Sequence, residues 1–347
     1  MKYHVGPAMA MGILLFAQVG GCVSRPKPGT ILPRCGDEIV IAGQFVHTGA
    51  PVVLWMDPGG YDAYRTERRF VPWEKASFAA TTQEVRDIDT PNRYNIRFAP
   101  STRPTTAPQT GELSPEQFEQ VRGGGWDLKL LQDKVDQFVI HYDVCGTSRQ
   151  CFNILHDHRG LSVHFMLDID GTIYQTLDVK ERAWHATKAN SRSVGIEIAN
   201  IGAYPPDRSS VLDQWYRKDP DGRTRMVLPA WMKHEWIRTP NFIPRPIRNE
   251  PVIGQIQGRE YKMYDLTPQQ YDSLIKLTAA LCKTLPKIRC DYPRDENGKL
   301  IPHVLTDEQF EQYQGVLGHF HVQANKQDPG PAFQWDRVIN GARKLMK

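Results

Sequence analysis

The sequence predicts a mixed α/β fold, in which a mixed central β-sheet is flanked by helices and preceded by a β-rich N-terminal extension. Three stretches, 137–142, 162–175 and 193–199, have the apolar and β-branched content of strands. Two others, 267–285 and the residues after Pro331, carry apolar side chains at helical spacing. Strands and amphipathic helices in one chain must pack as layers around a shared core, which favours this fold class.

The strand predictions rest on local patterns. Residues 137–142 read Gln-Phe-Val-Ile-His-Tyr, a buried strand that ends in a histidine. Residues 162–175 read as two strands joined at Asp170-Gly171, a pair typical of tight hairpin turns. Residues 193–199 read Ser-Val-Gly-Ile-Glu-Ile-Ala, an apolar strand that contains one carboxylate. These three stretches therefore predict the strands of the central sheet.

The helix predictions rest on capping and spacing. Thr267 suits an N-cap and Pro268 suits the first helical turn. Apolar residues then recur at helical spacing, at Tyr271, Leu274, Leu277 and Leu281. A final helix is expected after Pro331, running through Trp335, Val338, Ile339 and Leu345.

Length and composition describe an ordinary globular chain. Its 347 residues are 40% hydrophobic and 24% charged, which is enough for a sizeable core. The net charge of +4, without a dense Lys/Arg block, excludes a nucleic-acid partner. We expect this organisation: a lipoprotein signal peptide at 1–22, a tether at 23–35, an accessory β-rich region at 36–98, a Pro/Thr-rich linker at 99–125, and a main domain at 126–347 with an insertion at about 203–255.

The N-terminus predicts export. The apolar stretch from Ala8 to Val19 is too short to span a bilayer but suits a signal peptide. It ends in Val19-Gly-Gly-Cys22, which resembles a bacterial lipobox whose cysteine is cleaved and lipidated. An ordinary secretory signal remains the alternative. By analogy with enteric lipoproteins, Val23 indicates a lipid anchor in the outer membrane, with the protein facing the periplasm.

Export changes how the remaining cysteines are interpreted. Cys145 and Cys151 are close in sequence, and so are Cys282 and Cys290. In an oxidising compartment each pair could form a short-loop disulfide, although spacing does not fix connectivity and buried thiols remain the alternative. Cys35 is left without an assigned partner.

Residues 318–333 combine residue types that suit metal chemistry. His319 follows an apolar run, and Lys326 and Asp328 precede a Pro-Gly-Pro turn that can fold back. A catalytic zinc ion takes three protein ligands and leaves one position open. His141, at the end of a predicted strand, could join His319 and Asp328 in such a site. On spacing alone this triple is weak, because the chain has 11 histidines.

Four motifs in order resemble a known family. These are Phe138-Val-Ile-His-Tyr; Ser162-Val-His-Phe…Asp170-Gly-Thr-Ile-Tyr-Gln with Arg182-Ala-Trp-His-Ala; Ser193-Val-Gly-Ile-Glu-Ile; and Gly318-His…Lys326-Gln-Asp-Pro-Gly-Pro-Ala-Phe. Together they resemble the zinc-dependent N-acetylmuramoyl-L-alanine amidases of the amidase-2 type, the AmpD/AmiD-like group, which is related to peptidoglycan recognition proteins. The resemblance covers about residues 126–347, apart from the insertion.

The resemblance implies a role for each matched residue. His141, His319 and Asp328 would bind Zn²⁺, Glu197 would act as general base, and Lys326 would stabilise the oxyanion. The substrate would be peptidoglycan or muropeptides, cut between N-acetylmuramic acid and L-alanine in cell-wall turnover or recycling. The alternatives are a non-catalytic recognition module and a lytic enzyme secreted against other cells.

Other residues are assigned with less support. His185 is expected either to line the cleft near the metal or to be structural. His164 is expected to be packed under the sheet, His321 to be either a supporting or a surface residue, and His156 and His158 to be solvated. Asp168 and Ile169 stand where the AmpD-like branch often has a basic residue, which puts stem-peptide recognition in doubt. The insertion is hypothesised to roof the cleft.

Overall fold

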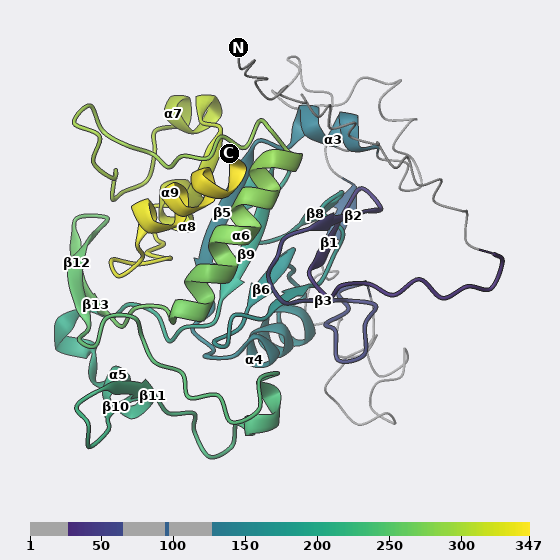
Figure 1. The fold of residues 1–347 in the computed structure, drawn as a ribbon. Coiled ribbons are helices and arrows are strands. Elements are labelled where there is room, and N and C mark those ends of the chain that lie inside the picture. The colour runs from purple at the N-terminus through teal and green to yellow at the C-terminus, as the bar shows by residue number, and fades with distance from the viewer. Residues whose placement is uncertain (1–26, 65–93, 97–126) are drawn as a thin grey trace, which may run out of the picture. The chain divides into compact units, whose positions relative to one another are not determined.

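The computed structural model describes residues 27–64, 94–96 and 127–347 (Figure 1). By its contacts the chain divides into residues 1–34 and a compact unit of residues 35–347. The signal peptide and the linker lie outside the described residues. Within the described ranges, we find no helix with both the length and the apolar character needed to cross a membrane.

A six-stranded mixed sheet forms the centre of the compact unit, as the sequence predicts. Its strands lie in the order β14 (Gly315–Gly318), β5 (Gln137–Tyr142), β9 (Ser193–Ile198), β6 (Phe165–Leu167), β7 (Ile173–Gln175) and β3 (Val52–Leu54). All neighbouring strands run parallel except β6 and β7, which form the predicted hairpin. The carboxyl ends of β14, β5 and β9 therefore meet at one edge, the usual place for a site in a parallel sheet.

One face of the sheet is covered by α6 (Pro268–Thr284) and α9 (Trp335–Met346) (Figure 1). Phe138 and Ile140 of β5 belong to the core that these helices bury. Side chains alternate between the two faces of a strand. Val139 accordingly joins a second cluster, and His141 shares its face. The covered face stabilises the fold and leaves the other face for chemistry.

The two long helices form where the sequence predicts them. Thr267 and Gln270 make a reciprocal capping box at the start of α6, and Pro268 occupies the first turn. Tyr271, Leu274 and Leu277 are fully buried against the sheet. The spacing that predicted the helix is thus the spacing of its buried face.

Shorter elements complete the described part of the unit. The helices are α3 (Leu128–Lys134), α4 (Ser148–Phe152), the π-helix η2 (Asn153–His158), α5 (Ser210–Trp215), α7 (Asp307–Gln312) and α8 (His319–Val322), with 3-10 turns η3 (Thr187–Ala189), η4 (Pro206–Arg208) and η5 (His234–Trp236). Two-stranded antiparallel pairs join β1 (Glu38–Ile41) to β2 (Gln44–His47), β4 (Tyr94–Ile96) to β8 (Glu181–Ala183), β10 (Tyr216–Lys218) to β11 (Thr224–Met226), and β12 (Val252–Ile256) to β13 (Arg259–Met263).

The region expected at 36–98 is β-rich where it is described, and it is built into the unit. β3 pairs with β7 and so belongs to the central sheet. The β1–β2 hairpin is tied to the end of β7 and to the loop after it: Gln175 accepts a hydrogen bond from the Val40 backbone N–H (2.7 Å), and Asp178 accepts one from the Ala42 N–H (2.8 Å). The boundaries of this region stay a prediction, because residues 65–93 and 97–98 lie outside the described residues.

Candidate active site

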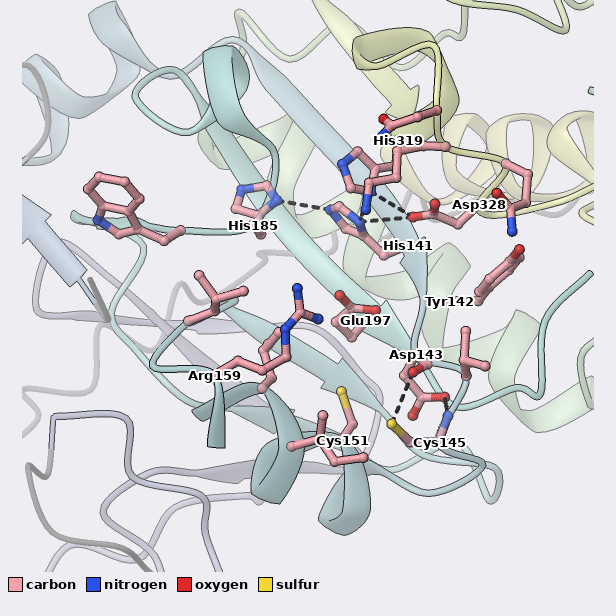
Figure 2. A pocket seen from close by; sticks show the side chains of 18 residues that line it. His141, Tyr142, Asp143, Cys145, Cys151, Arg159, His185, Glu197, His319 and Asp328 are labelled. Carbon is pink, nitrogen blue, oxygen red and sulfur yellow. Dashed lines mark hydrogen bonds and ion pairs between the residues drawn. The ribbon is translucent and has the colours of Figure 1, made fainter. Parts of the chain in front are cut away.

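Three side chains converge at the carboxyl edge of the sheet. His141 lies near the end of β5, His319 begins α8 directly after β14, and Asp328 lies in the following loop (Figure 2). The His141 and His319 Nδ1 atoms are 2.9 Å apart, and each is 3.0 Å from the Asp328 Oδ2 atom. All three side chains are buried. The structure thus brings together the three residues predicted as metal ligands.

Strand pairing and a tight loop produce this convergence. β14 and β5 pair in parallel, with Gly318 opposite Ile140. The residues that follow these two, His319 and His141, therefore lie side by side. The Phe320 backbone N–H donates to the Asp328 carbonyl oxygen (3.2 Å), which closes the loop. A Cβ atom at Gly318 would lie 2.7 Å from Pro329 Cδ, so the fold requires glycine there.

The hydrogen bonds of the two imidazoles fix which nitrogen faces the centre. His319 Nε2 donates to Gln323 Oε1 (2.8 Å), which leaves Nδ1 as an acceptor. His141 Nε2 contacts His185 Nδ1 (2.9 Å), and His185 Nε2 contacts Ser193 Oγ (3.1 Å). With a metal bound, Nε2 of both rings would carry the proton, and each Nδ1 atom would direct its lone pair at the ion beside Asp328. Without a metal, the same Nδ1 atoms can donate to the Asp328 carboxylate.

This donor set fits a divalent metal. Two imidazole nitrogens and one carboxylate oxygen, all acceptors, lie at mutual distances of 2.9–3.0 Å. Left uncompensated, each buried acceptor would cost about 1–3 kcal/mol, which a shared cation offsets. Two histidines and a carboxylate, with outer hydrogen bonds that orient the rings, are suitable ligands for catalytic zinc.

The protonation states also suit metal binding. Burial, and then the charge of His319, lower the pKa of His141 to about 4. Burial alone would raise the pKa of Asp328, but the charge of His319 and the hydrogen bonds from both imidazoles hold it well below its usual range. At neutral pH His141 is therefore neutral and Asp328 ionised, as metal ligands must be.

Glu197 faces the same space. It lies on β9 directly opposite His141 in the strand register, and its Oε2 atom has no hydrogen-bond partner among the described residues (Figure 2). Burial, followed by the charges of Asp328 and Asp143, raises the pKa of Glu197 well above its ordinary value. A perturbed carboxyl group beside a predicted metal site is a candidate proton-transfer group.

A cavity of about 370 Å³ connects these groups. Its lining includes the three predicted ligands and, around them, Glu197, Lys326 and His185. Lys326 is partly exposed and precedes Asp328 by two positions. The cavity therefore joins a metal-binding set, a carboxyl group with a raised pKa and an ammonium group.

The family model for N-acetylmuramoyl-L-alanine amidase matches residues 131–331. The chain belongs to this amidase family. The matched span includes every side chain that converges in the cavity. It also includes the insertion at about 203–255.

Solved structures with similarity to this chain are distant. LysCS, an endolysin amidase from Clostridium intestinale, is 17% identical and covers 62% of this chain and 88% of its own, with a TM-score of 0.32. AmpDh3 from Pseudomonas aeruginosa, solved with anhydromuramic pentapeptide, is 17% identical over 60% of each chain, with a TM-score of 0.34. AmiD from E. coli, solved with anhydro-N-acetylmuramic acid-L-Ala-D-γ-Glu-L-Lys, is 18% identical over 60% of this chain and 57% of its own, with a TM-score of 0.34. Among curated proteins, no match to this sequence was found.

Three residues of this amidase domain support the predicted ligands. The sequence indicated one of them, His185, without fixing its role, and it did not indicate Gln323 or Gln257. His185, flagged by its Ala-Trp-His-Ala motif, both lines the cavity and orients His141. Gln323 orients His319, and no local signal distinguishes it. Gln257, between β12 and β13, directs its side-chain amide at the carbonyl oxygens of Phe320, Gln323 and Lys326, at 2.8–3.3 Å. Gln257 is more than 60 residues from His319 and Asp328 in the sequence, so only the fold reveals that it holds the loop between these two ligands, which we call the ligand loop.

Of the other four histidines assigned from sequence, His156, His164 and His321 are buried and structural, so the surface alternative for His321 is wrong, and His158 is exposed as expected. His164 accepts from the Gly195 N–H (3.1 Å) and contacts the Glu181 carbonyl oxygen (2.9 Å). His321 is fully buried, because the strand ends at Gly318 and the helical turn directs its ring away from the ligands. The expectation that His156 is solvated is wrong: it is buried in η2, with Nδ1 2.9 Å from Asp157.

The predicted disulfide partners are neighbours in space, with free thiols. One donor atom each of Asp143, Cys145 and Cys151 lie within 4.8 Å of one another at the cavity wall. A hydrogen bond with Cys145, and then burial, raise the pKa of the Cys151 thiol. A hydrogen bond with Cys290 likewise raises the pKa of Cys282. Both disulfides stay predictions.

Two expectations about the substrate cleft change with the structure. Asp168 is fully buried and accepts hydrogen bonds from the Ile169 N–H (2.9 Å) and the Ser148 N–H (3.3 Å), so it is a structural residue and does not line the cavity. Among the described residues of 203–255, none lines the cavity. Trp215 and Met226 of this insertion pack instead beside Gly146, on the loop after β5.

We expect His319→Ala and His321→Ala to separate a ligand from a structural histidine. At saturating zinc, His319→Ala should bind one equivalent less than the unaltered chain, because a coordinating nitrogen is removed. His321→Ala should bind the same amount but lose about 2 kcal/mol or more of unfolding free energy, because the Gly318 N–H and the Ile301 carbonyl lose their partner. Equilibrium dialysis and urea denaturation of the metal-free protein measure the two effects. Equal zinc loss in both variants would contradict this assignment.

Proposed function

We propose that this chain is a zinc-dependent N-acetylmuramoyl-L-alanine amidase, which hydrolyses the amide bond between N-acetylmuramic acid and L-alanine in peptidoglycan or muropeptides. One observation carries the proposal. His141, His319 and Asp328 converge in a cavity that also contains Glu197 and Lys326, within a domain that belongs to this amidase family. A module that only binds its ligand needs no such set.

Zinc held by the three ligands would polarise the scissile carbonyl and lower the pKa of the attacking water. An amide is a poor electrophile with a poor leaving group, so the chain must also supply proton transfer and charge stabilisation. The rigid pairing of β5 with β9 keeps Glu197 beside the ligand set. The geometry therefore holds the reacting parts in place before the substrate arrives.

Glu197 is the group that moves protons in this proposal. It takes a proton from the attacking water and passes it to the leaving L-alanine nitrogen. Burial and the neighbouring carboxylates Asp328 and Asp143 raise the pKa of Glu197, while the positive charge of Lys326 opposes them. A raised pKa makes the ionised carboxylate a stronger base and its protonated form available to donate to the leaving nitrogen.

Lys326 is the group that stabilises negative charge on the attacked carbonyl oxygen. Its side chain lines the cavity. Its backbone is held near the ligands, because the Lys326 carbonyl oxygen accepts a hydrogen bond from the Gln257 side-chain amide (3.3 Å). The preorganised ammonium group does not have to reorganise when charge develops. Its side chain is only partly exposed, which limits screening by water.

We further propose that the enzyme is a lipid-anchored protein of the outer membrane that faces the periplasm and acts in cell-wall turnover or recycling. The support is the sequence of residues 8–22, which ends in the lipobox-like Val19-Gly-Gly-Cys22.

We expect Glu197→Gln to abolish turnover while zinc stays bound. Loss of the general base should lower the rate of stem-peptide release by about 10²–10⁴-fold, because glutamine is isosteric but cannot carry the proton. The assay is mass spectrometry of products from purified sacculi and, separately, from soluble anhydro-muropeptides. Glu260→Gln, at an exposed position on β13, is the matched control and should keep full activity.

Full activity in the Glu197 variant would remove the residue from the mechanism. An unaltered chain that binds muropeptides but cleaves neither substrate would favour the recognition module instead.

We expect Lys326→Ala to lower kcat by about 10²–10³-fold without loss of zinc, as the removal of an oxyanion-stabilising group does. Lys326→Arg should recover part of the rate, because it restores the positive charge. Lys344→Ala, at an exposed position on α9, is the control for loss of a lysine elsewhere. Unchanged kcat in Lys326→Ala would show that the ammonium group is not aimed at the reacting oxygen.

We expect Cys22→Ala to move the protein from the membrane fraction to the soluble fraction, because the lipid attachment point is lost. Its amidase activity on soluble muropeptides should not change. Cys35→Ser is the control for loss of a thiol outside the lipobox, and it should stay in the membrane fraction. Membrane retention of the Cys22 variant would contradict the anchor.

A further inference from the structure

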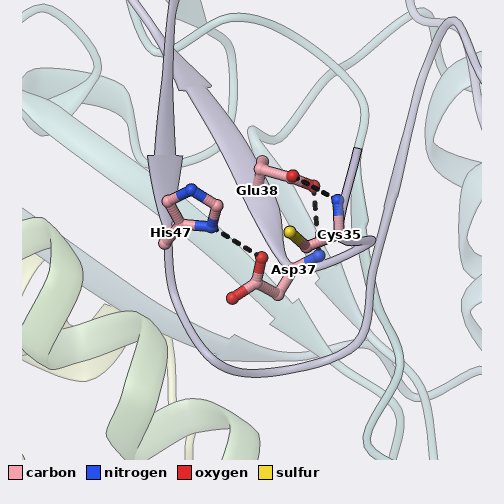
Figure 3. A group of neighbouring side chains, drawn as sticks. All are labelled: Cys35, Asp37, Glu38 and His47. Atoms are coloured by element: carbon pink, nitrogen blue, oxygen red, sulfur yellow. Dashed lines mark hydrogen bonds and ion pairs between the residues drawn. The ribbon is translucent and has the colours of Figure 1, made fainter. Parts of the chain in front are cut away.

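A second group of metal-ligating side chains lies outside the active site, at the open end of the β1–β2 hairpin. Cys35, Asp37, Glu38 and His47 each place one donor atom within 4.8 Å of the others. Figure 3 shows the four side chains gathered where β1 begins and β2 ends. The group combines a thiol, two carboxylates and an imidazole, and the proposed amidase reaction uses none of them.

Backbone pairing fixes the positions of these four residues. Glu38 and His47 are opposite each other in the β1–β2 pairing, so the pairing itself makes their backbones neighbours. The Asp37 carbonyl accepts from the Thr48 N–H (3.0 Å), and Asp37 Oδ2 accepts from the Gly49 N–H (2.9 Å). These bonds tie the segment before β1 to the segment after β2. The donors therefore converge on a framework that is ordered without a metal.

One pair of donors in this group is as close together as the active-site ligands, and all four lie within 4.8 Å of one another. Asp37 Oδ1 is 2.9 Å from His47 Nδ1, and the predicted catalytic ligands lie 2.9–3.0 Å from one another. A metal ion can occupy the place that the His47 proton now takes.

Glu38 is a preorganised anion at the base of this group. Only 5% of it is exposed, and its carboxylate accepts backbone N–H groups of Cys35 (2.5 Å), Gly36 (2.8 Å) and Asp37 (3.2 Å). These backbone groups hold the Glu38 carboxylate in place beside the other three donors. The Cys35 thiol and the His47 ring are exposed, so an ion can enter from solvent.

We propose that Cys35, Asp37, Glu38 and His47 form a second, structural metal site of the zinc class. Four protein donors close the coordination shell, which is the property that separates structural zinc sites from catalytic ones. Sulfur and imidazole nitrogen favour zinc over magnesium or calcium, which take oxygen ligands. Binding would release the Cys35 thiol proton and displace the His47 Nδ1 proton, because both donors must be deprotonated.

This site would clamp the hairpin where the chain enters the compact unit. The metal would join the segment before β1 to the last residue of β2, and β1 buries Ile39 and Ile41 in the main core. It also gives a role to Cys35, the cysteine without a disulfide partner. The inference goes beyond the proposed amidase activity and does not depend on it.

The test is a metal count on the purified, detergent-solubilised full chain after chelation and return to a fixed free zinc concentration. We expect Cys35→Ser and His47→Ala each to bind one equivalent fewer than the unaltered chain, with unchanged amidase activity. His303→Ala, at an exposed histidine elsewhere in the domain, is the matched control and should bind the full amount. The unaltered count in both hairpin variants would overturn the proposal.

Cobalt identifies the thiolate. Replacement of zinc by Co²⁺ should give a sulfur-to-metal charge-transfer band that Cys35→Ser abolishes and Cys151→Ser keeps, which separates this site from the Asp143, Cys145 and Cys151 group. A band that is absent from the unaltered chain, or that requires Cys151, would count against the proposal. In chelator, the Cys35→Ser variant and the unaltered chain should have the same melting temperature. With zinc, the variant should melt at a lower temperature than the unaltered chain, because only the unaltered chain is stabilised by the second ion. Equal melting temperatures with zinc would also overturn the proposal.

Discussion

The active site depends above all on the parallel pairing of β5 with both β9 and β14. This pairing sets Glu197 opposite His141 and brings His319 alongside, so three functional side chains from distant parts of the sequence meet at one edge. Because side chains alternate along a strand, a slip of one residue would turn His141 or Glu197 into the apolar core. The cost of burying such a group keeps the register fixed. The backbone hydrogen bonds between β5, β9 and β14 therefore fix both the packing of the core and the positions of the active-site side chains.

A second layer of contacts converts this placement into a defined ligand set. His185 rests on the strand at Gly195, where an added Cβ would lie 2.5 Å from the His185 ring. The small residue is thus the reason that an imidazole can lie beside His141. Gln323 performs the corresponding task for His319. Outer contacts of this kind commonly change metal affinity by about 10–100-fold, so they matter almost as much as the ligands themselves.

The N-terminal segment has a structural connection to the amidase domain and is more than a spacer. β3 extends the central sheet, and β1 packs into the core that α6 also covers. Polar contacts add to this apolar contact: Gln175 bonds both the N–H and the carbonyl of Val40, and Asp178 accepts from the backbone of the hairpin turn. The described residues from Cys35 to Tyr64 are therefore integrated into the domain fold. The proposed second metal would strengthen the outermost part of this connection.

The sequence by itself determined the fold class, the central strands β5, β6, β7 and β9, the long helices and the identity of the converging residues. Those features are local: period-2 and helical patterns, the Thr267 cap, and motifs that place polar residues at strand ends. Tertiary structure alone decided the rest. It buried His156 and Asp168, which look solvated or substrate-facing in sequence, and it kept the insertion away from the cavity. It also recruited Gln257 to the ligand loop and gathered Cys35, Asp37, Glu38 and His47. Contacts between residues far apart in sequence leave no periodic signal, because only strand register and loop closure set their distances.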